Sequence, residues 1–186
     1  MSWTTPLFFA LAVISGWPLP TQDQSPITSL YTDLGSSKCK TTQVEDETGS
    51  SVQNCPGVAG YKLQVLDDDS RQSITVVTPD LKEHPLDLWE VVTRSFSSVG
   101  NKAEWRVTRS RNKISPVALI VRVQASEDSG NPKRVTSYLA VAKITPDAIC
   151  VTHKIAPGTK ANEEARRAAD GAQSAPCLKG ATSNLP

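Results

Sequence analysis

Three pairs of segments in this chain follow a pattern that is mostly of period two, with apolar residues at alternate positions, as in a β-strand with a buried face. A short polar connection separates the two segments of each pair, and this arrangement indicates a β-hairpin. The paired ranges are residues 61–66 with 71–77, 103–107 with 117–123, and 138–144 with 149–155. The sequence therefore predicts a mainly antiparallel β-sheet of about six strands, either open or curled.

The third hairpin is specific enough to predict a register. Its turn is formed by residues 145–148, where Pro146 suits the second position of a type I turn. The opposed residues are then Ile144 with Ile149, Ala142 with Val151, Ala140 with His153, and Tyr138 with Ile155. We expect this apolar face to line the core. The opposite face carries Leu139, Val141, Lys143, Cys150, Thr152 and Lys154, and its two apolar residues indicate that the sheet is covered on both sides.

One segment near the C-terminus has the features of an α-helix. Asn162 can cap its first turn, and Glu163 and Glu164 follow where the helix dipole favours anions. Alanines recur at helical spacing, at positions 161, 165, 168, 169 and 172. Such a stripe permits close approach to a sheet, so we expect an α+β fold with one C-terminal helix docked on the sheet. Residues 86–92 fit either a short helix or a strand.

The ends of the chain differ in composition from its middle. Residues 7–14 are eight consecutive apolar residues, far fewer than the roughly 20 that a membrane-spanning helix needs. This run suits a secretory signal peptide, which we assign to residues 1–20; the alternative is a loosely packed or disordered N-terminus. Residues 21–37 are predicted to be a polar tether, residues 38–178 a single α+β domain, and residues 179–186 a disordered tail. No transmembrane segment is expected.

The net charge and the cysteines of the chain indicate its class and its compartment. The 186 residues carry a formal net charge of +1, which argues against a strongly basic nucleic-acid-binding protein. The four cysteines lie in two local pairs, and we expect the disulfides Cys39–Cys55 and Cys150–Cys177 because each pair is close in sequence. Disulfides need an oxidising compartment, so a periplasmic or secreted location is predicted. The alternative is four buried thiols in a cytosolic protein.

Candidate chemistry is sparse along the chain. None of the common nucleophile, zinc-protease or phosphate-loop motifs occurs, and we assign no catalytic residue, metal site or cofactor. His153 lies on an apolar strand face, where a hydrogen-bonded core histidine is the ordinary interpretation, and His84 lies in a loop beside Pro85. The acidic run at residues 67–69 lacks the ligand spacing of a calcium loop and indicates an exposed turn.

The strongest surface signal is a cluster of cations around the second hairpin, formed by Lys102, Arg106, Arg109, Arg111, Lys113 and Arg122. We expect Glu104 to lie opposite Arg122 in this hairpin. The arginines at 106, 109 and 111 then stay available to a carboxylate, a phosphate or a polyanionic glycan. Trp105 alternates with small apolar residues and is predicted to be core. The alternative is a solvated hairpin whose charges prevent aggregation at a sheet edge.

Six short segments, none specific by itself, carry a resemblance through their order. They are Tyr31-Thr32-Asp33-Leu34, the C-P-G-x-x-G-Y segment at residues 55–61, Glu104-Trp105-Arg106, residues 139–143, Cys150-Val151 and Ala165-Arg166. In this order they resemble a group of small exported bacterial proteins of unknown function. The resemblance spans residues 31–177 and implies an envelope or secreted location, but it brings no catalytic residues. A weaker likeness to periplasmic lysozyme inhibitors, in size and bridged β-sheet only, has no matching motif.

These observations favour an exported, non-enzymatic binding or accessory domain of the bacterial cell envelope, similar in role to an inhibitor. Its expected partner is an envelope protein or an anionic glycan, bound through the sheet edge or the basic hairpin. The first alternative is a small periplasmic hydrolase or transferase that uses His153 with a carboxylate, although the sequence offers no set of nucleophile, base and orienting group. The second alternative is a structural envelope protein.

Overall fold

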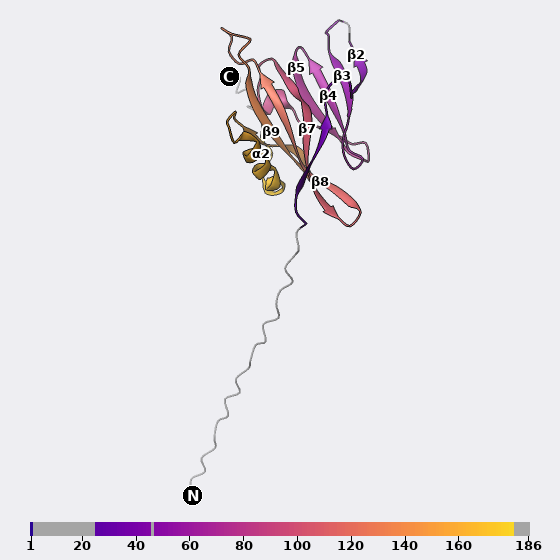
Figure 1. The fold of residues 1–186 in the computed structure, drawn as a ribbon, viewed down its shortest axis with the longest axis vertical. Helices are drawn as coiled ribbons and strands as arrows, with labels where there is room; N and C mark the ends of the chain where they lie inside the picture. Colours follow the sequence, from indigo (N-terminus) through magenta and orange to yellow (C-terminus); the bar gives the residue numbers. More distant parts are fainter. Residues whose placement is uncertain (2–24, 46, 181–186) are drawn as a thin grey trace.

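One mixed β-sheet forms the body of the molecule, as Figure 1 shows for the computed structural model, which describes residues 1, 25–45 and 47–180. Its ten strands are β1 (Thr28–Asp33), β2 (Lys40–Val44), β3 (Ser51–Pro56), β4 (Lys62–Asp68), β5 (Arg71–Val77), β6 (Glu83–Pro85), β7 (Ser97–Ser110), β8 (Lys113–Ala125), β9 (Thr136–Ile144) and β10 (Ile149–Ile155). The described helices are α1 (Leu88–Val91), α2 (Ala161–Asp170) and the 3₁₀ turn η1 (Ala172–Ser174). The predicted strands are confirmed as β4, β5 and β7 to β10.

The sheet is larger than predicted and is not purely antiparallel. The strand order is β10-β9-β8-β7-β5-β4-β3-β2, with β1 paired to β7 and β6 paired to β5. All neighbours are antiparallel except β5 and β7, which meet in parallel through Arg71 and Ser97. The prediction of about six antiparallel strands was therefore wrong in number and in one pairing, whereas the α+β composition and the C-terminal helix are as predicted.

The missed strands lack an apolar alternation because they bury little surface. All five residues of β2 are exposed, as expected for a polar edge strand. Strand β1 lies in the segment predicted to be a tether, yet it pairs with β7 from Thr28 opposite Val107 to Asp33 opposite Lys102. The domain boundary placed at residue 38 was therefore wrong. The assigned signal peptide, apart from Met1, and the last six residues of the assigned tail lie outside the described residues.

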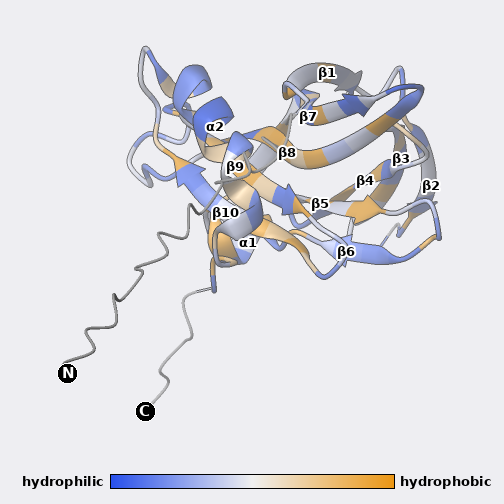
Figure 2. Cartoon of the chain, turned by 90° about the horizontal axis from the view of Figure 1, so that it is seen from below, coloured by the Kyte–Doolittle hydropathy of each residue, from blue (hydrophilic) through white to orange (hydrophobic). Residues whose placement is uncertain are grey.

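The core has two parts on opposite faces of the sheet. Figure 2 shows the sheet curling, so that β4 and β5 face β7 and β8 across an apolar interior. Leu63, Ile74, Trp105 and Leu119 are fully buried there, which confirms Trp105 as a core residue. The second part lies between α2 and the β8–β9 pair. It comprises Ile120, Leu139, Val141, Ile155 and the buried alanines Ala118, Ala165, Ala169 and Ala172, with Ala161 and Ala168 packed at its margin.

The predicted register of the third hairpin holds only near its turn. Ile144 lies opposite Ile149 and Ala142 opposite Val151, but a β-bulge follows between Val151 and His153. The extra residue shifts the pairing, so the predicted pairs of Ala140 with His153 and Tyr138 with Ile155 were wrong. His153 is opposite Val141 instead, and Ile155 is opposite Leu139 and packs on the helix side.

Helix α2 begins slightly earlier than predicted. Its N-cap is Lys160, without a side-chain capping bond. The predicted cap, Asn162, lies inside the first turn, where its Oδ1 accepts a hydrogen bond from Arg122 Nη2 at 3.1 Å. The helix therefore relies on packing and its Ala stripe more than on a cap.

Both predicted disulfides are formed. Cys39–Cys55 ties the entry of β2 to β3, and Cys150–Cys177 ties the chain beyond α2 to β10. The Leu178 N–H donates to Val151 O at 2.7 Å, which holds this last segment along the β10 edge. Within the described residues, no helix has the length and apolar character needed to cross a membrane.

The C-P-G-x-x-G-Y segment forms the connection from β3 to β4. A Cβ atom on Gly57 would lie 2.3 Å from Tyr61 O, so only glycine fits this close approach. Gly60 has φ +85°, in the left-handed region that favours glycine. The two glycines therefore serve the geometry of a tight turn.

Candidate functional site

The six predicted cations divide into two groups in the structure. Lys102, Arg106 and Arg122, which we call the inner cations, lie on the body of the sheet and have side-chain partners. Arg109, Arg111 and Lys113, which we call the tip cations, lie at the end of the β7–β8 hairpin and are exposed. The sequence cluster is thus not one binding surface.

Arg106 is a buried ion-pair residue and not a free cation. It is only 8% exposed. Its Nε donates to Asp170 Oδ1 at 2.7 Å and its Nη2 to Asp170 Oδ2 at 2.9 Å, which is a bidentate pair with the last residue of α2. Nη1 also contacts Ser29 Oγ on β1. The prediction that Arg106 stays available to an anion was therefore wrong, because α2 supplies its partner.

Glu104 has a different neighbour from the one predicted. It lies opposite Ile120, and not opposite Arg122, because the register is set by the turn after Ser110 and by the irregularity between Arg106 and Val107. Its carboxylate accepts hydrogen bonds from Arg166 Nε at 2.7 Å and Nη2 at 3.2 Å, and from Ser29 Oγ. Burial raises the pKa of Glu104, but the hydrogen bonds from Arg166 and Ser29 outweigh burial and hold the pKa below its usual value.

The charges of β7 and α2 match in sign and in spacing. Glu104 and Arg106 are two residues apart on a strand, a separation of roughly 6.6 Å. Arg166 and Asp170 are four residues apart on a helix, a rise of about 6 Å. Each strand charge therefore meets an opposite helix charge, Glu104 with Arg166 and Arg106 with Asp170. This spacing is the signal that could have identified Arg166 and Asp170 from the sequence.

The other inner cations are also engaged. Lys102 Nζ donates to Asp33 Oδ1 at 2.9 Å, and this contact lowers the pKa of Asp33. Arg122 donates to Ser137 Oγ at 2.8 Å as well as to Asn162. These contacts join β1, β8, β9 and α2 to the centre of the sheet. The inner cations are therefore best explained by the packing of α2 and β1.

The tip cations lie on a ribbon that projects from the sheet. Pairing of β1 with β7 ends at Val107, and pairing of β9 with β8 begins at Ala118. Residues 108–110 pair only with residues 113–115, and Figure 1 shows this part of the hairpin extending beyond the sheet. Pro116 lies at the register irregularity where the ribbon leaves the sheet, a position that tolerates the missing N–H of proline.

The side chains of the tip cations form no hydrogen bond or ion pair in the described part of the chain. Arg109 lies opposite Ile114 and Lys113 opposite Ser110, so strand alternation directs Arg109 and Lys113 to opposite faces of the ribbon. Arg111 lies in the turn with φ 51°, which is uncommon for a residue other than glycine or asparagine. The three charges therefore surround the end of the ribbon.

The remaining candidates show ordinary structural roles. His153 is half-buried, and its Nδ1 lies 2.9 Å from Thr152 Oγ1, with no carboxylate hydrogen-bonded to it among the described residues. Asp69 and Ser70 both have positive φ and form the expected turn between β4 and β5. In the ranges that the structure covers, no group of three or more His, Cys, Asp or Glu side chains is placed to hold a metal ion.

Comparison with known proteins gives no relative. No protein-family model, curated protein or solved structure matches this chain. The resemblance to small exported bacterial proteins therefore stays a prediction. Its segments do meet in space, because Tyr31 Oη accepts a hydrogen bond from Arg166 Nη2 at 3.1 Å and Trp105 Nε1 donates to Thr32 Oγ1 at 2.9 Å.

Proposed function

We propose that this protein is an exported, non-enzymatic binding domain of the bacterial cell envelope that holds an anionic glycan with the tip of its β7–β8 hairpin. The observation that carries the proposal is the projecting ribbon with three exposed cations, Arg109, Arg111 and Lys113. The two disulfides favour a location outside the reducing cytosol.

The arrangement of the tip cations suits an extended polyanion. Their side chains project from both faces of the ribbon and from the turn. One small anion therefore cannot contact all three, whereas a polymer with repeated negative charges can. The two arginines can bind carboxylate or sulfate oxygens in a bidentate manner, and Lys113 adds a point charge. Because the site is exposed, its affinity should decrease as salt increases.

The test compares two triple variants of the full oxidised chain. One replaces Arg109, Arg111 and Lys113 with serine. The control replaces Lys40, Lys62 and Lys133 with serine and therefore removes the same net charge. These lysines are exposed and distant in sequence from the hairpin tip. Affinity for heparin and polygalacturonate oligosaccharides is measured by calorimetry at low salt. The proposal expects at least a tenfold loss in the tip variant alone; equal losses in both variants would show only a general charge effect and contradict it.

A further inference from the structure

A hollow lies where strands β5 and β7 diverge. Strands β5 and β7 share one bridge, between Arg71 and Ser97, and Ser97 N–H donates to Ser70 O at 2.9 Å. Beyond this bridge their backbones no longer pair, and the Gln72 side chain takes the place of a backbone acceptor by accepting from Val99 N–H at 2.9 Å. A hollow of about 280 Å³ lies beside this junction.

The polar lining of the hollow is rich in amides and hydroxyls. Gln72 is fixed, because its Nε2 also donates to Asp67 Oδ2 at 2.9 Å. Gln124 Oε1 lies 3.5 Å from Ser98 Oγ, while its amide N–H groups have no hydrogen bond within the described residues. Ser97 is 7% exposed, and its Oγ is buried without a hydrogen-bond partner there. Such unsatisfied hydroxyls are rare in folded proteins.

An aromatic ring stands beside these polar groups. Phe96 lines the hollow and is 53% exposed, an unusual state for a large apolar side chain. The Arg71 guanidinium lies 4.9 Å from the ring centroid and covers one side of the ring. Val135, which is 50% exposed, lines the same hollow. The ring is therefore held by Arg71 while a large part of its surface remains open.

We propose that this hollow binds one ring of a neutral saccharide. A sugar ring presents C–H groups that pack on an aromatic ring, and vicinal hydroxyls that both donate and accept hydrogen bonds. The Phe96 ring can pack on the C–H groups of the sugar. The amide of Gln124 and the carboxylate of Asp67 can form hydrogen bonds with its hydroxyls. The lining includes one carboxylate and no Lys or Arg among the described residues, which disfavours an anion. Its volume is at the lower end of small-molecule sites, about 300 Å³, and suits a single ring.

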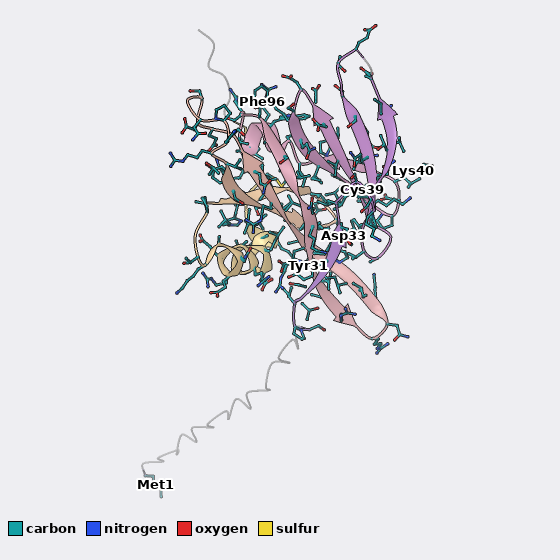
Figure 3. The ribbon with its side chains drawn as sticks, turned by 45° about the horizontal axis from the view of Figure 1, so that its top comes forward. Met1, Tyr31, Asp33, Cys39, Lys40 and Phe96 are labelled. Atoms are coloured by element: carbon teal, nitrogen blue, oxygen red, sulfur yellow. A yellow bond between two sulfur atoms is a disulfide. The ribbon has the colours of Figure 1, made fainter. Side chains whose placement is uncertain are left out.

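This site does not depend on the tip cations. Figure 3 places Phe96 at the end of the molecule away from Tyr31, the strand-β1 residue that lies toward the β7–β8 ribbon. The proposal therefore goes beyond the anionic-glycan function. Substitution of the tip cations should leave saccharide binding unchanged, so the two proposals can fail separately.

The test uses saturation-transfer difference NMR and calorimetric titration of the full oxidised chain. The probes are N,N′-diacetylchitobiose, cellobiose and maltose, with glucuronate as the anionic comparison. Phe96→Ala and Gln124→Ala should each weaken binding of the best neutral probe at least tenfold. Leu81→Ala and Gln43→Ala are matched controls, because both residues are exposed and neither lines the hollow. Circular dichroism melts establish that each variant is folded.

Two results would overturn the proposal. One is that none of the neutral probes gives saturation transfer to the parent protein, or that only glucuronate does. The other is that folded Phe96→Ala and Gln124→Ala proteins bind the best neutral probe as tightly as the Leu81→Ala and Gln43→Ala controls.

Discussion

Arg106 and Arg109 are three residues apart on the same strand, yet their environments are opposite. Arg106 is enclosed between β7 and α2 and forms a bidentate pair with Asp170. Arg109 lies beyond Val107, where the pairing of β7 with β1 ends, and it is exposed. The difference shows that the value of a cation for binding depends on whether another element covers its strand. A cluster of positive charges in sequence can therefore contain both packing residues and binding residues.

The largest effect is expected on the core side of the same strand. Trp105 is fully buried, and its Nε1 donates to Thr32 on β1. Trp105→Ala should reduce the free energy of unfolding by about 3–5 kcal/mol, because it leaves a cavity in the core. Urea unfolding measures this change. A loss below about 1 kcal/mol would show that the strand is not packed as described.

The next largest effect on stability is expected for Arg106→Ala, and it should differ from the effect of Arg109→Ala. Arg106→Ala removes a buried guanidinium and its hydrogen bonds to Asp170, whose side chain is 39% exposed, and should lower the free energy of unfolding by about 1.5–3 kcal/mol. Arg109→Ala should change it by no more than about 0.5 kcal/mol, because its exposed side chain forms no hydrogen bond or ion pair with the described residues. Chemical denaturation of both variants under one condition gives the comparison. Equal values for the two variants would break the distinction between inner and tip cations.

Much of the fold follows from local sequence pattern. The six predicted strands, the alanine stripe of the helix and the cysteine pairs were all readable, because each depends on residues close in sequence. Strand β1 was not readable, since its residues are only partly buried and carry no clear alternation. The bulge at Thr152 was also missed, because apolar residues continue at alternate positions, Ile149, Val151 and Ile155, on both sides of it.

The candidate site was predicted in part for a related reason. The tip cations lie in a short turn or beside it, so their exposure follows from the hairpin alone. The fate of Arg106 depends on Asp170, which is 64 residues away in sequence. Such a partner is set by the docking of α2, which no local pattern specifies. The matched charge spacing on strand and helix is the signal that could have identified it, and it was not used in the prediction.

A smaller effect is expected from acid. Glu104 has a lowered pKa in the folded protein, so its ionised form stabilises the fold above the ordinary carboxyl pKa of about 4.5. This contribution is lost as the pH falls through the lower pKa of the folded state. Thermal melts from pH 7 to pH 3 should show a destabilisation by Glu104→Gln that is largest near pH 7 and shrinks in acid. A difference independent of pH would contradict the ionised pair.

The smallest stability effect is expected at the tip. Replacement of Arg109, Arg111 and Lys113 with serine should leave the melting temperature within about 2 °C of the parent, because these exposed side chains form no hydrogen bond or ion pair with the described residues. Differential scanning calorimetry checks this at pH 7. A larger decrease would mean that the tip cations stabilise the fold, and would weaken their assignment to binding.

The division of the cations into packing and binding groups is tested most directly by NMR. The ¹⁵N-labelled full chain is titrated with a heparin hexasaccharide, and backbone amide shifts are followed residue by residue. We expect the largest shifts within residues 108–117, with little change at Glu104, Arg106 or along α2. Shifts centred on the inner cations, or spread evenly over the exposed lysines, would contradict the assignment of anion binding to the hairpin tip.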